Sequence, residues 1–152
     1  MRYRIVAVGR LRRGFAADGC RHYLERLIRL AQVEVVEVKA FKGNPERVRT
    51  AESEALLAAA EGYLVTLDER GKAWRSQELA RNLTTLELDG ISRLSLLIGG
   101  AEGLSQAARK RADASWRLSD LTLPHELARL LLLEQLYRAE TIRAGHPYHR
   151  QG

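Results

Sequence analysis

Five short apolar runs alternate along the chain with five longer segments in which apolar residues recur at helical spacing. The runs cover residues 4–8, 33–38, 63–67, 94–98 and 115–118, and the helical segments cover residues 15–30, 45–61, 76–88, 105–112 and 124–143. Continuous apolar runs of this length are typical of strands that are buried on both faces. The alternation therefore predicts an α/β fold with a parallel sheet.

The last helical segment, residues 124–143, carries apolar side chains over well over half of its circumference. One face of a sheet covers a narrower strip of a helix than this. A second copy of the chain is the simplest additional cover, so the pattern favours a homodimer that packs through this helix. The alternative is a helix wedged deep within one subunit.

Three loops, residues 68–72, 99–103 and 118–124, follow the third, fourth and fifth predicted strands. In a parallel sheet they gather at one edge, where α/β proteins bind ligands. Most of their residues are apolar or glycine, which suits a flat or apolar ligand held by backbone groups. The alternative for Gly99 and Gly100 is an ordinary turn between a strand and a helix.

The glycines of the second loop match neither common phosphate-binding motif. Gly99, Gly100 and Gly103 lack both the G-x-G-x-x-G spacing and a following Gly-Lys-Ser/Thr, and the last two loops contain no lysine. This argues against a nucleotide hydrolase. No metal site is expected either, because Cys20 is the one cysteine and the pair His146 and His149 has no third ligand nearby.

The composition indicates one domain over residues 1–152, with 45% hydrophobic residues available for a core. A single cysteine fits a reducing, cytoplasmic location. The leucine run at residues 130–133 is too short to span a membrane, so no membrane partner is expected.

The net charge of +6 is concentrated near the N-terminus, because residues 1–50 hold 12 lysines and arginines against 5 acidic residues. A basic region rich in arginine favours a polyanionic partner such as a nucleic acid. The alternative is that these arginines lie on solvated helix faces with no partner.

Four blocks of sequence resemble the RlmH family, SPOUT-class methyltransferases that modify ribosomal RNA. The blocks are VTLDERGK at 65–72, LLIGGAEGLS at 96–105, LSDLTLPHELARLLLLEQLYRA at 118–139 and HPYHR at 146–150. The resemblance implies a C-terminal trefoil knot and a homodimer packed through the terminal helix. It also implies that S-adenosylmethionine binds in the knot loops, and that N3 of a pseudouridine in helix 69 of 23S rRNA is methylated on the assembled 70S ribosome.

The same blocks assign candidate residues. By the resemblance of these motifs to those of the family, the residues expected to bind the cofactor are Leu67, Asp68, Gly99, Gly100, Leu118, Ser119, Asp120, Leu121, Thr122, Leu123 and Pro124. One departure is Ala101, where many relatives have proline, and it implies a looser turn.

The resemblance also implies that the C-terminal tail reaches the partner's site, which makes Tyr148, His149 and Arg150 candidate catalytic residues. We expect His149 to take the proton from N3, since histidine titrates near neutral pH. Tyr148 is then a stacking surface for the base, and Arg150 a contact to base or phosphate. The alternative is that this tail simply docks the end of the helix, and His125 is interpreted as structural.

No segment has the pattern of a separate RNA-binding domain, so recognition would use basic side chains of the dimer surface, namely Arg10, Arg12, Arg13 and Lys42. Two other functions stay open from the residues alone. One is a SPOUT methyltransferase with a tRNA target, and the other is a basic RNA- or ribosome-binding dimer without catalysis.

Overall fold

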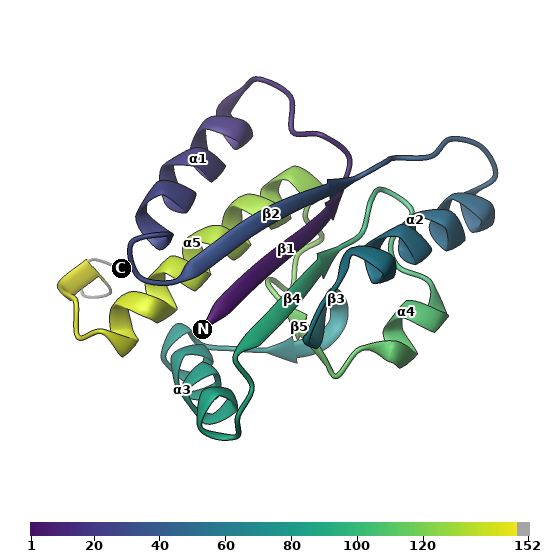
Figure 1. The fold of residues 1–152 in the computed structure, drawn as a ribbon. Helices are drawn as coiled ribbons and strands as arrows, with labels where there is room; N and C mark the ends of the chain where they lie inside the picture. The colour runs from purple at the N-terminus through teal and green to yellow at the C-terminus, as the bar shows by residue number, and fades with distance from the viewer. Residues whose placement is uncertain (149–152) are drawn as a thin grey trace.

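A computed structural model describes residues 1–148 and consists of strands that alternate with helices (Figure 1). The strands are β1 (Arg2–Val8), β2 (Gln32–Val38), β3 (Tyr63–Ala73), β4 (Arg93–Ile98) and β5 (Ala114–Arg117). The helices are α1 (Phe15–Leu27), α2 (Pro45–Ala59), α3 (Ser76–Leu88), α4 (Gln106–Arg111) and α5 (His125–Arg143). The predicted α/β alternation is confirmed, with shifts of a few residues at the ends of elements.

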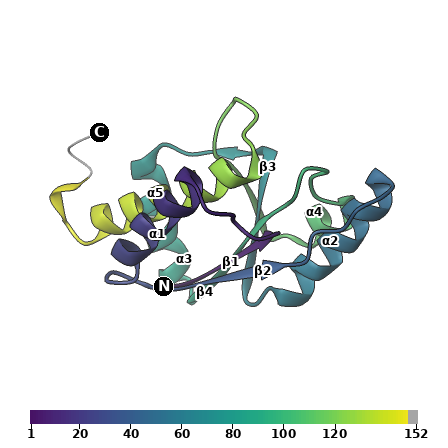
Figure 2. The same ribbon diagram turned by 90° about the horizontal axis from the view of Figure 1, so that it is seen from above.

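The strands form one parallel sheet in the order β2-β1-β4-β3-β5. In β1, Tyr3, Ile5 and Ala7 pack on the side of α1, α3 and α5. Val6 and Val8 pack on the opposite side, with α2 and α4 (Figure 2). Burial on both faces explains why the strands are continuous apolar runs rather than alternating ones. Because all strands are parallel, their carboxyl ends lie along the same edge.

α5 lies between α1 and α3 on one face of the sheet (Figure 1). Leu132, Leu133 and Leu136 are fully buried there within a single chain. The apolar surface of α5 therefore does not by itself require a second copy of the chain, because α1 and α3 cover most of it. Leu127 and Leu131 stay partly exposed.

β3 is longer than the sequence pattern predicts. Leu67 and Lys72 both pair with Trp116 of β5, so residues 68–71 bulge out between two paired stretches. The loop predicted at residues 68–72, which carries four charged side chains, is therefore part of the strand. Gly71 permits the return, because a Cβ at this position would lie 2.6 Å from backbone carbons of β5.

β5 pairs with β3, so the connection from β4 to β5 passes across β3. The trefoil knot that the resemblance implies stays a prediction. Within residues 1–148 no helix is long and apolar enough to cross a membrane.

Candidate functional site

The three predicted loops surround one cavity of about 800 Å³ at the carboxyl edge of the sheet. It lies beside the bulge of β3, at the ends of β4 and β5 and at the start of α5. Its lining includes Leu67, Asp68, Gly99, Gly100, Leu118, Ser119, Leu121, Thr122, Leu123 and Pro124. These are ten of the eleven residues assigned to the cofactor by motif, and the fold brings them together from three distant parts of the chain.

The remaining candidate, Asp120, does not line the cavity. Its carboxylate is exposed and pairs at 3.2 Å with Arg117, which does line the cavity. In the same loop Leu121 is 77% exposed, an unusual position for leucine, although its N–H is held by the Ser119 hydroxyl at 2.9 Å. An apolar side chain at the mouth of a cavity is available to cover a bound ligand.

In the glycine loop, residues 99–103, the backbone packs too closely for a side chain at some of the glycine positions. A Cβ at Gly99 would lie 3.0 Å from the carbonyl carbon of Gly103, and the N–H of Gly103 donates to the Gly100 carbonyl at 3.0 Å. Gly103 itself has a φ of 75°, in the region that favours glycine. The loop then enters α4, where the Ser105 hydroxyl accepts from the Ala108 N–H at 3.1 Å. Residues 99–103 thus form a turn between a strand and a helix, which was the alternative interpretation of Gly99 and Gly100. The same turn also forms one wall of the cavity.

A carboxylate with fixed charge lies in the wall of the cavity. The Asp68 side chain is 2% exposed, accepts from the Arg70 N–H at 2.9 Å and is paired with the Arg109 guanidinium. Burial acts to raise the pKa of Asp68, but these hydrogen bonds and the arginine charges outweigh it and hold the pKa below its usual value. Asp68 is therefore ionised at neutral pH.

Sequence reasoning missed two arginines of this site. Arg109 and Arg117 both line the cavity. They bring positive charge to a site in which the loops at residues 99–103 and 118–124 contain no lysine. Arg109 comes from the basic end of α4 and Arg117 from the last position of β5. The only sequence signal was the run Arg109-Lys110-Arg111, which gives no indication of which arginine turns inward. His125, expected to be structural, also lines the cavity.

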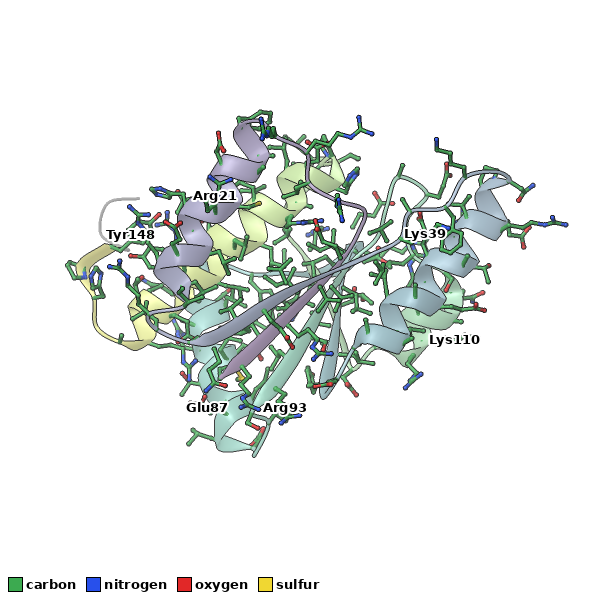
Figure 3. All side chains as sticks on the ribbon, turned by 45° about the horizontal axis from the view of Figure 1, so that its top comes forward. Arg21, Lys39, Glu87, Arg93, Lys110 and Tyr148 are labelled. Carbon is green, nitrogen blue, oxygen red and sulfur yellow. The ribbon has the colours of Figure 1, made fainter. Side chains whose placement is uncertain are left out.

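Within one chain, Tyr148 does not line this cavity. Tyr148 packs against Tyr137 with ring centroids 4.6 Å apart, and its hydroxyl donates to Glu134 at 3.2 Å. The cavity meets α5 at His125 and Ala128, whereas the Tyr148 ring lies beside Tyr137, about 14 Å further along the helix axis. Figure 3 shows Tyr148 at the opposite end of the molecule from Lys39 and Lys110. His149 and Arg150 lie outside the described residues.

Burial and the nearby Tyr23 and Glu134 raise the pKa of Tyr148 well above its ordinary value. Tyr148 therefore keeps its proton at neutral pH and is not suited to act as a base.

The candidate RNA contacts are exposed and share the carboxyl edge with the cavity. Arg10, Arg12 and Arg13 follow β1, and Lys42 follows β2. The first of these loops is held in place, because the Leu11 N–H donates to Glu37 at 3.0 Å. Its arginine side chains are therefore presented from an ordered backbone.

This arrangement can hold a flat, uncharged ring through backbone groups and leucine side chains, and it also offers charged side chains such as Asp68, Arg109 and Arg117. Arg109 is already paired with Asp68, so it is poorly placed to bind a triphosphate. A ligand of intermediate size with both apolar and charged parts fits the cavity best.

Comparison with known proteins gives a consistent result. Residues 1–149 match the family described as "Predicted SPOUT methyltransferase". A protein of Thermus thermophilus named ribosomal RNA large subunit methyltransferase H is 48% identical over 151 residues, covering 99% of each chain. A protein of Hahella chejuensis with the same name is 38% identical over 157 residues, covering 99% of this chain and all of the relative.

Among solved structures, a probable methylase family protein from Haemophilus influenzae aligns with a TM-score of 0.58 at 12% identity. The alignment covers 96% of this chain and 69% of that protein. At this identity the match shows a shared fold alone.

Proposed function

Because the chain belongs to the SPOUT methyltransferase family, we propose that it transfers a methyl group from S-adenosylmethionine to the RNA of the large ribosomal subunit. The observation that carries the proposal is the cavity at the carboxyl edge, where the three motif segments meet. Its volume of about 800 Å³ lies within the usual range for cofactor sites.

The residues present fit this cofactor. An adenine ring needs an apolar slot with backbone partners, which Leu118, Leu121 and Leu123 can line, and the loop at Gly99 and Gly100 allows close approach of the backbone. S-adenosylmethionine has no phosphate group. This agrees with the cavity, because Arg109 and Arg117 are already paired with the carboxylates of Asp68 and Asp120. When bound, S-adenosylmethionine supplies an electrophilic methyl carbon, and its S–C bond breaks as the methyl group passes to the base.

We place the target at N3 of a pseudouridine in helix 69 of 23S rRNA, on the assembled 70S ribosome. N3 carries a proton, which leaves as the new N–C bond forms, so a base is needed. His149 takes this proton. Tyr148 stays neutral and provides a stacking surface, which agrees with its raised pKa, and Arg150 contacts the RNA.

We propose that these tail residues act in the cavity of a second copy. The support is the position of Tyr148 within one chain, because its ring lies beside Tyr137, about 14 Å along α5 from the cavity residue Ala128. The partly exposed Leu127 and Leu131, together with Leu121, provide an apolar surface beside the cavity for the partner. Sedimentation of the purified chain tests the dimer directly, and a monomer at micromolar concentration would contradict it.

The exposed Arg10, Arg12, Arg13 and Lys42 are proposed as phosphate contacts of this surface. Their replacement by glutamine should weaken ribosome binding and reduce its dependence on salt, because each phosphate contact releases counterions. Unchanged binding would remove these residues from the interface. Because ribosomal RNA is the proposed substrate, we expect the chain to work in the cytoplasm.

The decisive experiment is transfer of labelled methyl groups from S-adenosylmethionine to 70S ribosomes, 50S subunits, naked 23S rRNA and tRNA. We expect label in 23S rRNA when 70S ribosomes are supplied, and its loss in an H149A variant with cofactor binding unchanged. Label in tRNA would instead support a tRNA methyltransferase. Absence of label together with absence of cofactor binding would support a non-catalytic RNA-binding dimer.

A further inference from the structure

A buried carboxylate on α2 lies against the glycine loop of the cavity. Glu52 is 3% exposed, and its Oε2 accepts from the Phe41 N–H at 3.0 Å. Its other oxygen, Oε1, is buried and has no hydrogen-bond partner among residues 1–148. A Cβ built on Gly100 would lie 2.8 Å from this Oε1, so the free oxygen lies against the Cα of Gly100, on the side where a side chain would point.

An unpartnered buried carboxylate oxygen costs free energy, which makes its position informative. Oε2 is fixed by the Phe41 N–H, and this anchor sets the direction in which Oε1 points. The neighbouring groups of α2 contact the same loop: the Ser53 hydroxyl accepts from the Ser105 N–H at 2.8 Å, and Arg49 donates to the Glu102 carbonyl at 2.9 Å. One face of α2 is thus built against residues 100–105.

Resting on the proposed cofactor, we infer that Glu52 is a positioning residue for the S-adenosylmethionine site. Its Oε1 is held as an acceptor for a backbone N–H of the glycine loop, and this bond is made when the loop closes on the bound cofactor. Glu52 does not line the cavity, so it acts through Gly100 and touches neither the cofactor nor the RNA. The bond formed on binding favours the closed loop.

The replacement E52Q tests this inference with little change in volume. The glutamine side chain can still accept from the Phe41 N–H, but it then turns an NH₂ donor toward a backbone donor. We expect S-adenosylmethionine to bind about tenfold more weakly by calorimetry, the size of a lost hydrogen bond to a charged acceptor. In turnover, KM for the cofactor should rise while kcat at saturating cofactor changes little. The matched control is E54Q, an exposed glutamate on the same helix, which should bind as the wild type does.

A second set of variants decides the matter if E52Q does not fold. G100A places a methyl group against Glu52 Oε1 and 3.2 Å from Val8 Cγ1, and it should weaken cofactor binding. In an E52A background the clash with Oε1 is absent, so G100A should cost several-fold less affinity there. If G100A lowers cofactor affinity by the same factor in the wild type and in E52A, the inference is overturned.

The outcomes separate the two proposals. If the wild type binds S-adenosylmethionine and E52Q binds it equally well, the role of Glu52 is wrong and the proposed function stands. If the wild type does not bind the cofactor at all, the proposed function fails and the inference falls with it.

Discussion

Arg129 on α5 joins three separate parts of the fold, which makes its replacement a sharp test of the packing described above. Its guanidinium is 4% exposed and donates to Glu37 at 2.6 Å and to the Gly9 carbonyl at 3.1 Å. Glu37 also accepts from the Leu11 N–H. Through these bonds Arg129 connects α5 to the end of β2 and to the arginine loop after β1.

The variant R129M keeps the aliphatic stem and removes the charge. A hydrogen bond to a charged group contributes about 1.5–3 kcal/mol, and one to a neutral carbonyl about 1 kcal/mol. Glu37 is 34% exposed, so water replaces part of the lost interaction and the lower end applies. We expect R129M to lower the free energy of unfolding by about 2–3 kcal/mol, which corresponds to a fall in Tm of about 5–10 °C.

The pH dependence gives an independent check on the same pair. Burial acts to raise the pKa of Glu37, but the hydrogen bonds from Arg129 and Leu11 and the nearby arginine charges outweigh it, so the pKa is lowered. A lowered pKa means that the stabilisation is present above the unfolded value of about 4.3 and is lost as pH falls through the folded value. This loss on acidification should be smaller in R129M.

Urea unfolding of the wild type, R129M, E37Q and the double variant at pH 7 and at pH 4 measures all of these quantities. E37Q keeps an acceptor for both donors but does not titrate, so its stability should depend less on acid than that of the wild type. A cost below about 0.5 kcal/mol for R129M, the range of ordinary surface changes, would refute the reasoning.

Three further predictions follow from buried contacts. G71A should destabilise the fold by several kcal/mol in urea unfolding, because a Cβ would lie 2.6 Å from the backbone of β5, and a stable G71A would contradict this. D68N leaves Arg109 without its charged partner in the cavity wall, so calorimetry should show weaker cofactor binding, whereas unchanged affinity would separate this ion pair from the site. Y3F removes the 2.5 Å hydrogen bond to the buried Glu140 and should lower the free energy of unfolding by about 1–3 kcal/mol, which thermal unfolding can measure.

The sequence pattern predicted the order of strands and helices because that order depends on local periodicity. The apolar runs at residues 94–98 and 115–118 both end at the cavity edge, as expected of parallel strands. The assignment of individual cofactor and RNA residues stays a prediction, although the fold places most of them around one cavity or on one edge.

Other features depend on contacts that no local pattern contains. The apolar circumference of α5 indicated that the helix is covered, but not that α1 and α3 cover it within the same chain. The charged residues after Leu67 suggested a turn, whereas pairing with Trp116 returns them to the sheet. The sequences of α4 and α2 do not indicate which of their charged residues turns inward, and only the fold places Arg109 beside Asp68 and Glu52 beside Gly100.

The position of the cavity also bears on how the chain folds. Its walls come from residues near 67, 100 and 120, and β5 must pair beside β3 before the last wall exists. A growing chain on the ribosome therefore has no complete cavity until its final third has been synthesised and has docked. A ligand that occupies the cavity binds only the finished fold, so it stabilises the folded protein by mass action and gives no help to earlier intermediates.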